Sequence, residues 1–184
     1  MTRAIFLAAG VLLLSVRASA AAHWNVDYSK SSLGFTVLWS SEPFSAKFKS
    51  WKADIDFDPA ALKQARASVV VDLASEASDE SDFDEDLKGA QGFQVSQFPA
   101  ARFVTESILR TAGNDYVATG DLTLKGITRR ISLPFTLTIS GSTAHMIGSA
   151  KVIRTDFGVG LGQWAAPEPV AREVTVSIDL TATR

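Results

Sequence analysis

The sequence predicts an all-β fold, an antiparallel sandwich or barrel of about eight short strands with one or two short helices. Apolar and polar residues alternate along most of the chain, as they do in strands with one buried and one solvated face. Turn residues separate these alternating segments at short intervals. The alternation also differs from the continuous apolar runs that parallel sheets of α/β proteins require.

The first half of the chain contains the shorter strands. Residues 33–39 alternate cleanly, with Leu33, Phe35, Val37 and Trp39 on one face. Segments 44–48 and 51–57 repeat the pattern, but the parity slips by one between them, which requires a β-bulge or a tight corner. Two further short strands are predicted at residues 69–73 and 101–106.

The second half shows the longest alternation. Strands are predicted at residues 121–125, 127–139 and 174–182, with turns at Gly126 and at residues 140–142. Two segments instead have helical features. Pro59–Arg66 is predicted as a short helix capped by Asp58, and residues 78–93 place Phe83, Leu87 and Ala90 at helical spacing.

The N-terminal segment has the features of a secretory signal peptide. Arg3 precedes an apolar run of residues 4–16, and Ala18-Ser19-Ala20 supplies small residues for a cut before Ala21. The run is shorter than the roughly 20 residues of a membrane span. We therefore expect a signal peptide at residues 1–20 and a barrel domain at residues 23–184. The protein would be exported to the periplasm or, alternatively, to the extracellular medium.

Composition excludes several classes of function. Removing the leader takes away two arginines and no acid, so the net charge would move from −2 to −4. Nucleic-acid-binding proteins normally carry a basic excess, so we expect no nucleic acid partner. The chain has no cysteine, which excludes disulfides and thiolate metal sites. We expect no cofactor, no metal, no stable membrane span, and either a monomer or a homodimer.

The predicted barrel interior points to a lipid ligand. Its lining would be apolar, and a catalytic pocket should instead show converging polar groups. We therefore expect no catalytic residues and no enzyme activity. Arg129 shares the inward parity and could reach a polar head group at the barrel mouth, although a salt bridge at the rim is the alternative. The predicted ligand-binding residues are Phe35, Val37, Trp39, Phe48, Phe103, Leu122, Leu124, Arg129, Leu133, Phe135, Val174, Val176 and Ile178.

Several motifs, in order, resemble the YceI-like lipid- and polyisoprenoid-binding family. The resemblance runs from residue 24 to residue 184. It begins at Trp24-Asn25-Val26-Asp27, continues through Ile55-Asp56-Phe57-Asp58-Pro59, and is most specific at residues 120–129, followed by Leu133-Pro134-Phe135 and by residues 154–160 and 174–176. It implies an extended eight-stranded antiparallel barrel, similar to lipocalins in shape, that holds an isoprenoid or a similar long-chain amphiphilic lipid. It implies sequestration or carriage of that lipid, without catalysis.

Other interpretations remain open at this point. The basic residues that many family members carry ahead of Leu87 are replaced by an acidic stretch, which favours a neutral head group such as a quinone or a fatty amide. The alternatives to a carrier are a lipid-modifying enzyme on the same barrel and a ligand-free structural or stress-response barrel filled by its own side chains.

Overall fold

The computed structural model describes residues 21–184, so the predicted signal peptide at residues 1–20 lies outside the described residues. The helix α1 spans Ser81–Lys88, and short 3₁₀ helices lie at Tyr28–Lys30, Leu62–Gln64, Leu73–Ser75, Arg154–Phe157 and Gly162–Trp164. The strands are β1 (Ala22–Val26), β2 (Ser32–Trp39), β3 (Glu42–Phe48), β4 (Trp51–Phe57), β5 (Arg66–Asp72), β6 (Glu76–Ala77), β7 (Ala100–Ala112), β8 (Asp115–Leu124), β9 (Ile127–Ser140), β10 (Thr143–Ile153) and β11 (Val170–Thr183).

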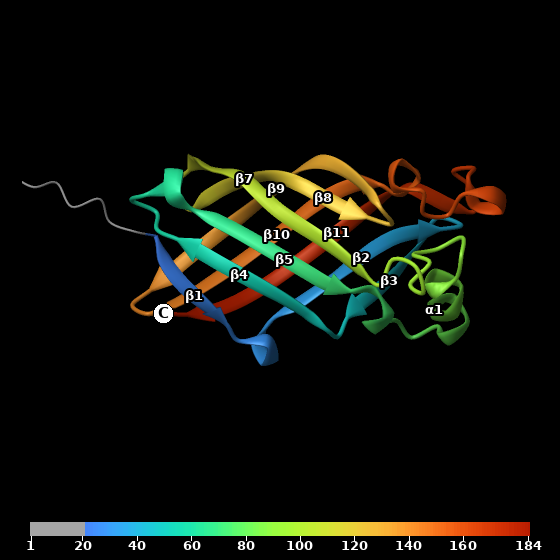
Figure 1. Cartoon of the computed structure of the whole chain (residues 1–184), viewed down its shortest axis with the longest axis horizontal. Coiled ribbons are helices and arrows are strands. Elements are labelled where there is room, and N and C mark those ends of the chain that lie inside the picture. Colours follow the sequence, from blue (N-terminus) through green and yellow to red (C-terminus); the bar gives the residue numbers. More distant parts are fainter. Residues whose placement is uncertain (1–20) are drawn as a thin grey trace, which may run out of the picture.

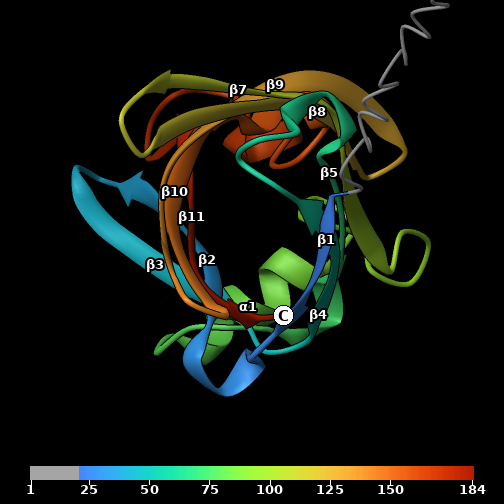
Figure 2. The same cartoon turned by 90° about the vertical axis from the view of Figure 1, so that its left-hand side faces the viewer.

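Eight of these strands close an antiparallel barrel, which confirms the predicted fold class. The ring runs β1-β4-β5-β7-β8-β9-β10-β11, and Asn25 pairs with Thr183 to join its first and last strands. Closure removes the exposed edges that an open sheet of this size would present. Figure 1 shows the barrel elongated along one axis, and Figure 2 looks along that axis into the ring of strands.

Three strands extend the barrel wall at one end. β2 pairs with β11, and β3 and β6 follow it outward. The parity slip predicted between residues 48 and 51 falls where the chain leaves β3 and enters β4, which pairs with β1 and β5 instead. The slip is therefore a corner between two parts of the wall.

The structure confirms the two predicted helices only in part. The prediction of a helix at Pro59–Arg66 is wrong, because only Leu62–Gln64 is helical and it forms a single 3₁₀ turn. Asp58 caps the turn before it, where the Ala60 N–H donates to Asp58 Oδ1 at 2.8 Å. Within residues 78–93 the helix α1 is shorter than predicted, since it spans only Ser81–Lys88 and Gly89 caps its end. None of the helices within residues 21–184 has both the length and the apolar character of a membrane span.

Two apolar clusters divide the barrel interior. One fills the end near β1 with large rings, including Trp24, Phe57, Tyr116 and Phe135. Tyr116 and Phe135 stack with their ring centroids 5.3 Å apart, and Phe57 meets Tyr116 edge-on at 5.5 Å. The other cluster surrounds the space near α1. One end of the tube is thus filled with side chains, and the other holds a cavity.

Candidate functional site

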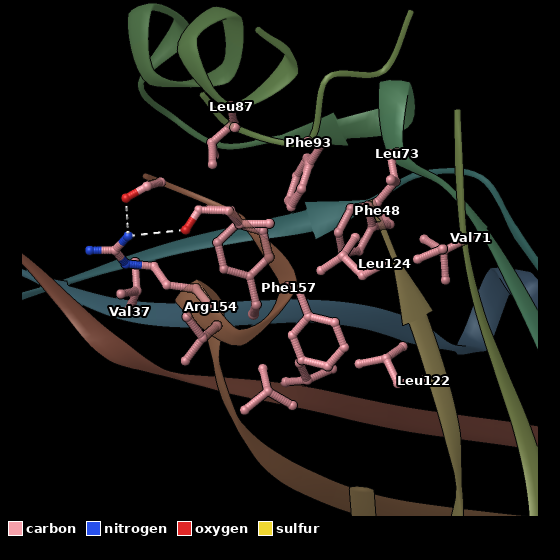
Figure 3. Close-up of a pocket in the computed structure, with 18 of the residues that line it drawn as sticks. Val37, Phe48, Val71, Leu73, Leu87, Phe93, Leu122, Leu124, Arg154 and Phe157 are labelled. Carbon is pink, nitrogen blue, oxygen red and sulfur yellow. Dashed lines mark hydrogen bonds between the residues drawn. The ribbon is translucent and has the colours of Figure 1, made fainter. Parts of the chain in front are cut away.

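An apolar cavity of about 220 Å³ occupies the α1 end of the barrel. A single water needs only about 10–15 Å³, so this space admits a molecule much larger than water. Figure 3 shows how side chains converge on it, with Leu87 and Phe93 on one side and Leu122 and Leu124 on the other. The strands supply this lining because every second residue of a strand points to the same face.

Most of the predicted ligand-binding residues line this cavity. They come from β2, β3, β7, β8, β9 and β11, whose inward parity follows the alternation in the sequence. Eleven of the thirteen lie in the wall: Phe35, Val37, Trp39, Phe48, Phe103, Leu122, Leu124, Leu133, Val174, Val176 and Ile178.

Two predicted residues lie elsewhere. Phe135 has the expected inward parity, but it belongs to the filled end, where it stacks on Tyr116. Arg129 pairs directly with Leu122, yet its side chain is exposed and Nη1 donates to the Thr128 carbonyl at 3.1 Å. A long aliphatic stem lets a guanidinium remain in water rather than lose its hydration in an apolar cavity. The salt bridge considered for the rim is instead made by Arg130, which pairs with Glu106.

Aromatic rings gather where α1 meets the end of the barrel. Trp39 and Phe83 lie with their centroids 4.4 Å apart, and Phe83 also contacts Phe44 at 5.3 Å. Trp164 approaches Trp39 from the opposite loop at 6.2 Å. Since Phe83 and Trp164 also line the cavity, these rings stand between the cavity and solvent at this end.

Two basic side chains hold the loops around this opening. Arg154 is buried and donates to backbone carbonyls that include those of Gly160, Val170 and Ala171, at 2.8, 2.8 and 3.0 Å. Lys125 Nζ donates to the carbonyls of Ala90, Gly92 and Gly158 at 2.8–3.1 Å. Arg154 is therefore engaged by the backbone, although its stem reaches the cavity wall (Figure 3).

A buried carboxyl lies beside this opening, and sequence reasoning missed it. Glu76 is only 2% exposed, and neither of its carboxyl oxygens has a hydrogen-bond partner within residues 21–184. It pairs directly with Phe48, so both side chains share the interior face of the sheet. Burial, and after it the negative charge of Asp84 on α1, raises the pKa of Glu76 to about 7. A strand of two residues is too short to show the alternation that would have revealed this orientation.

Charged residues are otherwise confined to the edge of the cavity. Asp86 and Arg102 contribute to its lining, but both are exposed. The helix α1 carries Asp82, Asp84, Glu85 and Asp86 against the single cation Lys88, so the helix side of the opening is acidic, while the basic residues Arg102, Lys125 and Arg154 lie elsewhere around it. The geometry therefore suits an apolar chain in the cavity, and an anionic group that approached past α1 would meet negative charge.

Comparisons with known proteins agree with this architecture. Burkholderia cenocepacia BcnA has a crystal structure that superposes with a TM-score of 0.83 and 32% identity, covering 86% of this chain and all of that one. A polyisoprenoid-binding domain from Saccharophagus degradans, implicated in plant cell wall breakdown, shares the fold with a TM-score of 0.69 and 15% identity, covering 89% and 98% of the two chains.

Curated relatives extend the similarity to whole proteins. A UPF0312 protein of Pseudomonas syringae pv. tomato is 27% identical, with 95% of this chain and 92% of the relative covered. One of Shewanella denitrificans is 25% identical over 84% of this chain and 81% of the relative. The model of the YceI-like domain matches residues 24–182, nearly all of the described barrel. The chain therefore belongs to the YceI-like family.

Proposed function

We propose that this protein is an exported carrier that sequesters a long-chain isoprenoid or a similar amphiphilic lipid in its barrel. The observation that carries the proposal is the cavity, which is enclosed by apolar side chains from opposite walls. Side chains fill the barrel at its other end only. The S. degradans domain that shares the fold is described as binding polyisoprenoid, which supports the same class of ligand here.

The tail of such a lipid would supply most of the affinity. Each buried methylene contributes about 0.8 kcal/mol, so a five-carbon isoprene unit contributes on the order of 3–4 kcal/mol. Three or four units exceed the lower estimates of the cost of association, which range over about 4–15 kcal/mol. The ligand therefore needs no strong polar contact to be retained.

The head group is proposed to be neutral, such as a quinone or a fatty amide. Arg154, the buried cation of the cavity wall, already donates to backbone carbonyls. The four acids of α1 would repel a pyrophosphate that approached the opening. A head group without charge avoids this repulsion and can remain close to solvent beside Trp39 and Phe83.

The sequence features of the predicted signal peptide support the proposed export. The run at residues 4–16 and the small residues at 18–20 support cleavage before Ala21 and delivery to the periplasm, or else to the medium. Fractionation of the native host, with an antibody against the barrel, tests this. Detection of the protein only in the cytoplasm would contradict it.

The experiment for the ligand is solvent extraction of protein purified from its native host, followed by mass spectrometry. An intact lipid at stoichiometric amount supports carriage, and a lipid converted by the protein would support an enzyme. An empty extract combined with failure to take up added isoprenoid would contradict carriage. A bound pyrophosphate lipid would refute the neutral head group while leaving carriage intact.

A further inference from the structure

We propose that the mature N-terminus, Ala21-Ala22-His23, is a binding site for Cu²⁺ and, more weakly, for Ni²⁺. The proposal rests on the export proposed above, because only cleavage before Ala21 frees the α-amino group of that residue. Histidine then becomes the third residue of the chain. The site is distinct from the lipid cavity, since β1 begins at the opposite end of the barrel from α1 (Figures 1 and 2).

The chemistry follows from the order of the donor atoms. A free amine, the backbone nitrogens of the second and third residues and the Nδ1 atom of the third residue can surround one ion as four nitrogen ligands in a plane. Square-planar nitrogen coordination is preferred by Cu²⁺ and Ni²⁺, whereas Zn²⁺ prefers a tetrahedron. Binding releases one proton from the ammonium group and one from each of the two amides to solvent.

The described geometry leaves the imidazole accessible. The His23 side chain is 56% exposed, and its Nδ1 atom, the nitrogen that the chelate needs, lies 3.0 Å from Asp56 Oδ1 and 3.7 Å from Asp54 Oδ1. Asp56 is also paired with Arg66, but the Asp54 carboxylate is 76% exposed. Asp54 is therefore available as a fifth, axial ligand, and both carboxylates place negative charge where a cation would arrive.

The barrel can tolerate the local rearrangement that chelation demands. The backbone nitrogens of Ala22 and His23 must turn toward the ion, which removes the first residues of β1 from their pairing with β4. The rest of the strand stays anchored by the Trp24 Nε1 hydrogen bond to the Phe57 carbonyl at 2.9 Å. Asn25 and Val26 also remain paired with β11.

The test uses the full chain expressed with its own leader and purified from the exported fraction. Intact mass identifies the first residue, and titration with Cu²⁺ is followed by visible absorption and electron paramagnetic resonance. We expect a chain that begins at Ala21 to bind one equivalent with the spectrum of four-nitrogen, square-planar Cu²⁺. Fluorescence of the adjacent Trp24 should be quenched as the ion binds.

Two variants and one control isolate the site. Replacing His23→Ala, or inserting one alanine between Ala21 and Ala22, should abolish this spectrum, because the first removes the imidazole and the second moves it to the fourth position. His145→Ala is the matched control, since His145 is also an exposed strand histidine, 2.8 Å from the carboxylate of Asp179. It should leave the spectrum unchanged.

The metal proposal is overturned if the exported chain begins at another residue, if the spectrum is absent, or if the inserted alanine leaves it intact. Each of these results is separate from the lipid measurement. Lipid carriage fails only when the solvent extract is empty and added isoprenoid is not taken up.

Discussion

The buried carboxyl of Glu76 should make the stability of this barrel fall as the pH rises. The ordinary pKa of a glutamate is 4.5, and burial raises that of Glu76 to about 7. Between pH 4.5 and about pH 7 the Glu76 carboxyl stays protonated in the folded protein but is ionised in the unfolded chain. The folded state therefore binds more protons, and the free energy of unfolding decreases with increasing pH across this window.

The magnitude follows from the two pKa values. One pKa unit corresponds to about 1.4 kcal/mol, so this carboxyl should contribute a loss of about 3 kcal/mol between pH 4.5 and pH 7. Above pH 7 both states are ionised and the contribution becomes constant. The Coulomb repulsion from Asp84 on α1 acts in the same direction as burial, so ionisation should first loosen the packing of this helix.

The assay is urea denaturation at several pH values for the native protein and for Glu76→Gln. The glutamine side chain has a similar size and cannot ionise, so the difference in unfolding free energy between the two proteins should change by about 3 kcal/mol over this range. Glu42→Gln, an exposed change on neighbouring β3, serves as the control and should show no such difference. Equal pH dependence in the native protein and Glu76→Gln would refute the reasoning.

Three further predictions follow from the wall, the filled end and the loops. Leu133→Asp places a charge in the cavity wall and should abolish isoprenoid uptake in a fluorescence displacement assay. Ser132→Asp, on the exposed face, is the control and should leave uptake intact. Normal uptake by Leu133→Asp would contradict the assigned lining. Phe135→Ala removes the ring stacked on Tyr116 and should cost about 3–5 kcal/mol in urea denaturation, so a change below 1 kcal/mol would show that this end is not tightly packed. Arg154→Met leaves several backbone carbonyls without their hydrogen-bond donor and should lower the unfolding free energy by about 3 kcal/mol. Amide hydrogen exchange over residues 158–170 should become faster. Unaltered exchange there would show that the loop is held by other contacts.

Much of the barrel wall could be predicted from the alternation of the sequence. A strand has a period of two, so each alternating segment identifies which of its side chains share a face, and the apolar face must be the buried one. This is why Phe35, Val37 and Val176 were identified as inward residues and do line the cavity. The order of motifs between residues 24 and 184 also indicated the family.

The position of a residue along the tube was decided only by the tertiary structure. Alternation specifies the face of a strand, but it does not specify which end of the barrel that stretch of strand occupies. Phe135 has the same parity as Leu133, yet only Leu133 lies in the cavity wall. Pairing and register between distant strands bring Phe135 to Tyr116 and Phe57, where their rings fill the tube.

Contacts between elements far apart in the chain decided the remaining features. The orientation of Glu76 depends on its pairing with Phe48, and the role of Arg154 depends on carbonyls of a loop that folds back over it. The sequence by itself determined an antiparallel barrel with an apolar interior, because that follows from the local period of two. The tertiary structure determined which end is hollow and which polar groups are buried there, because both depend on how the closed ring brings distant residues together.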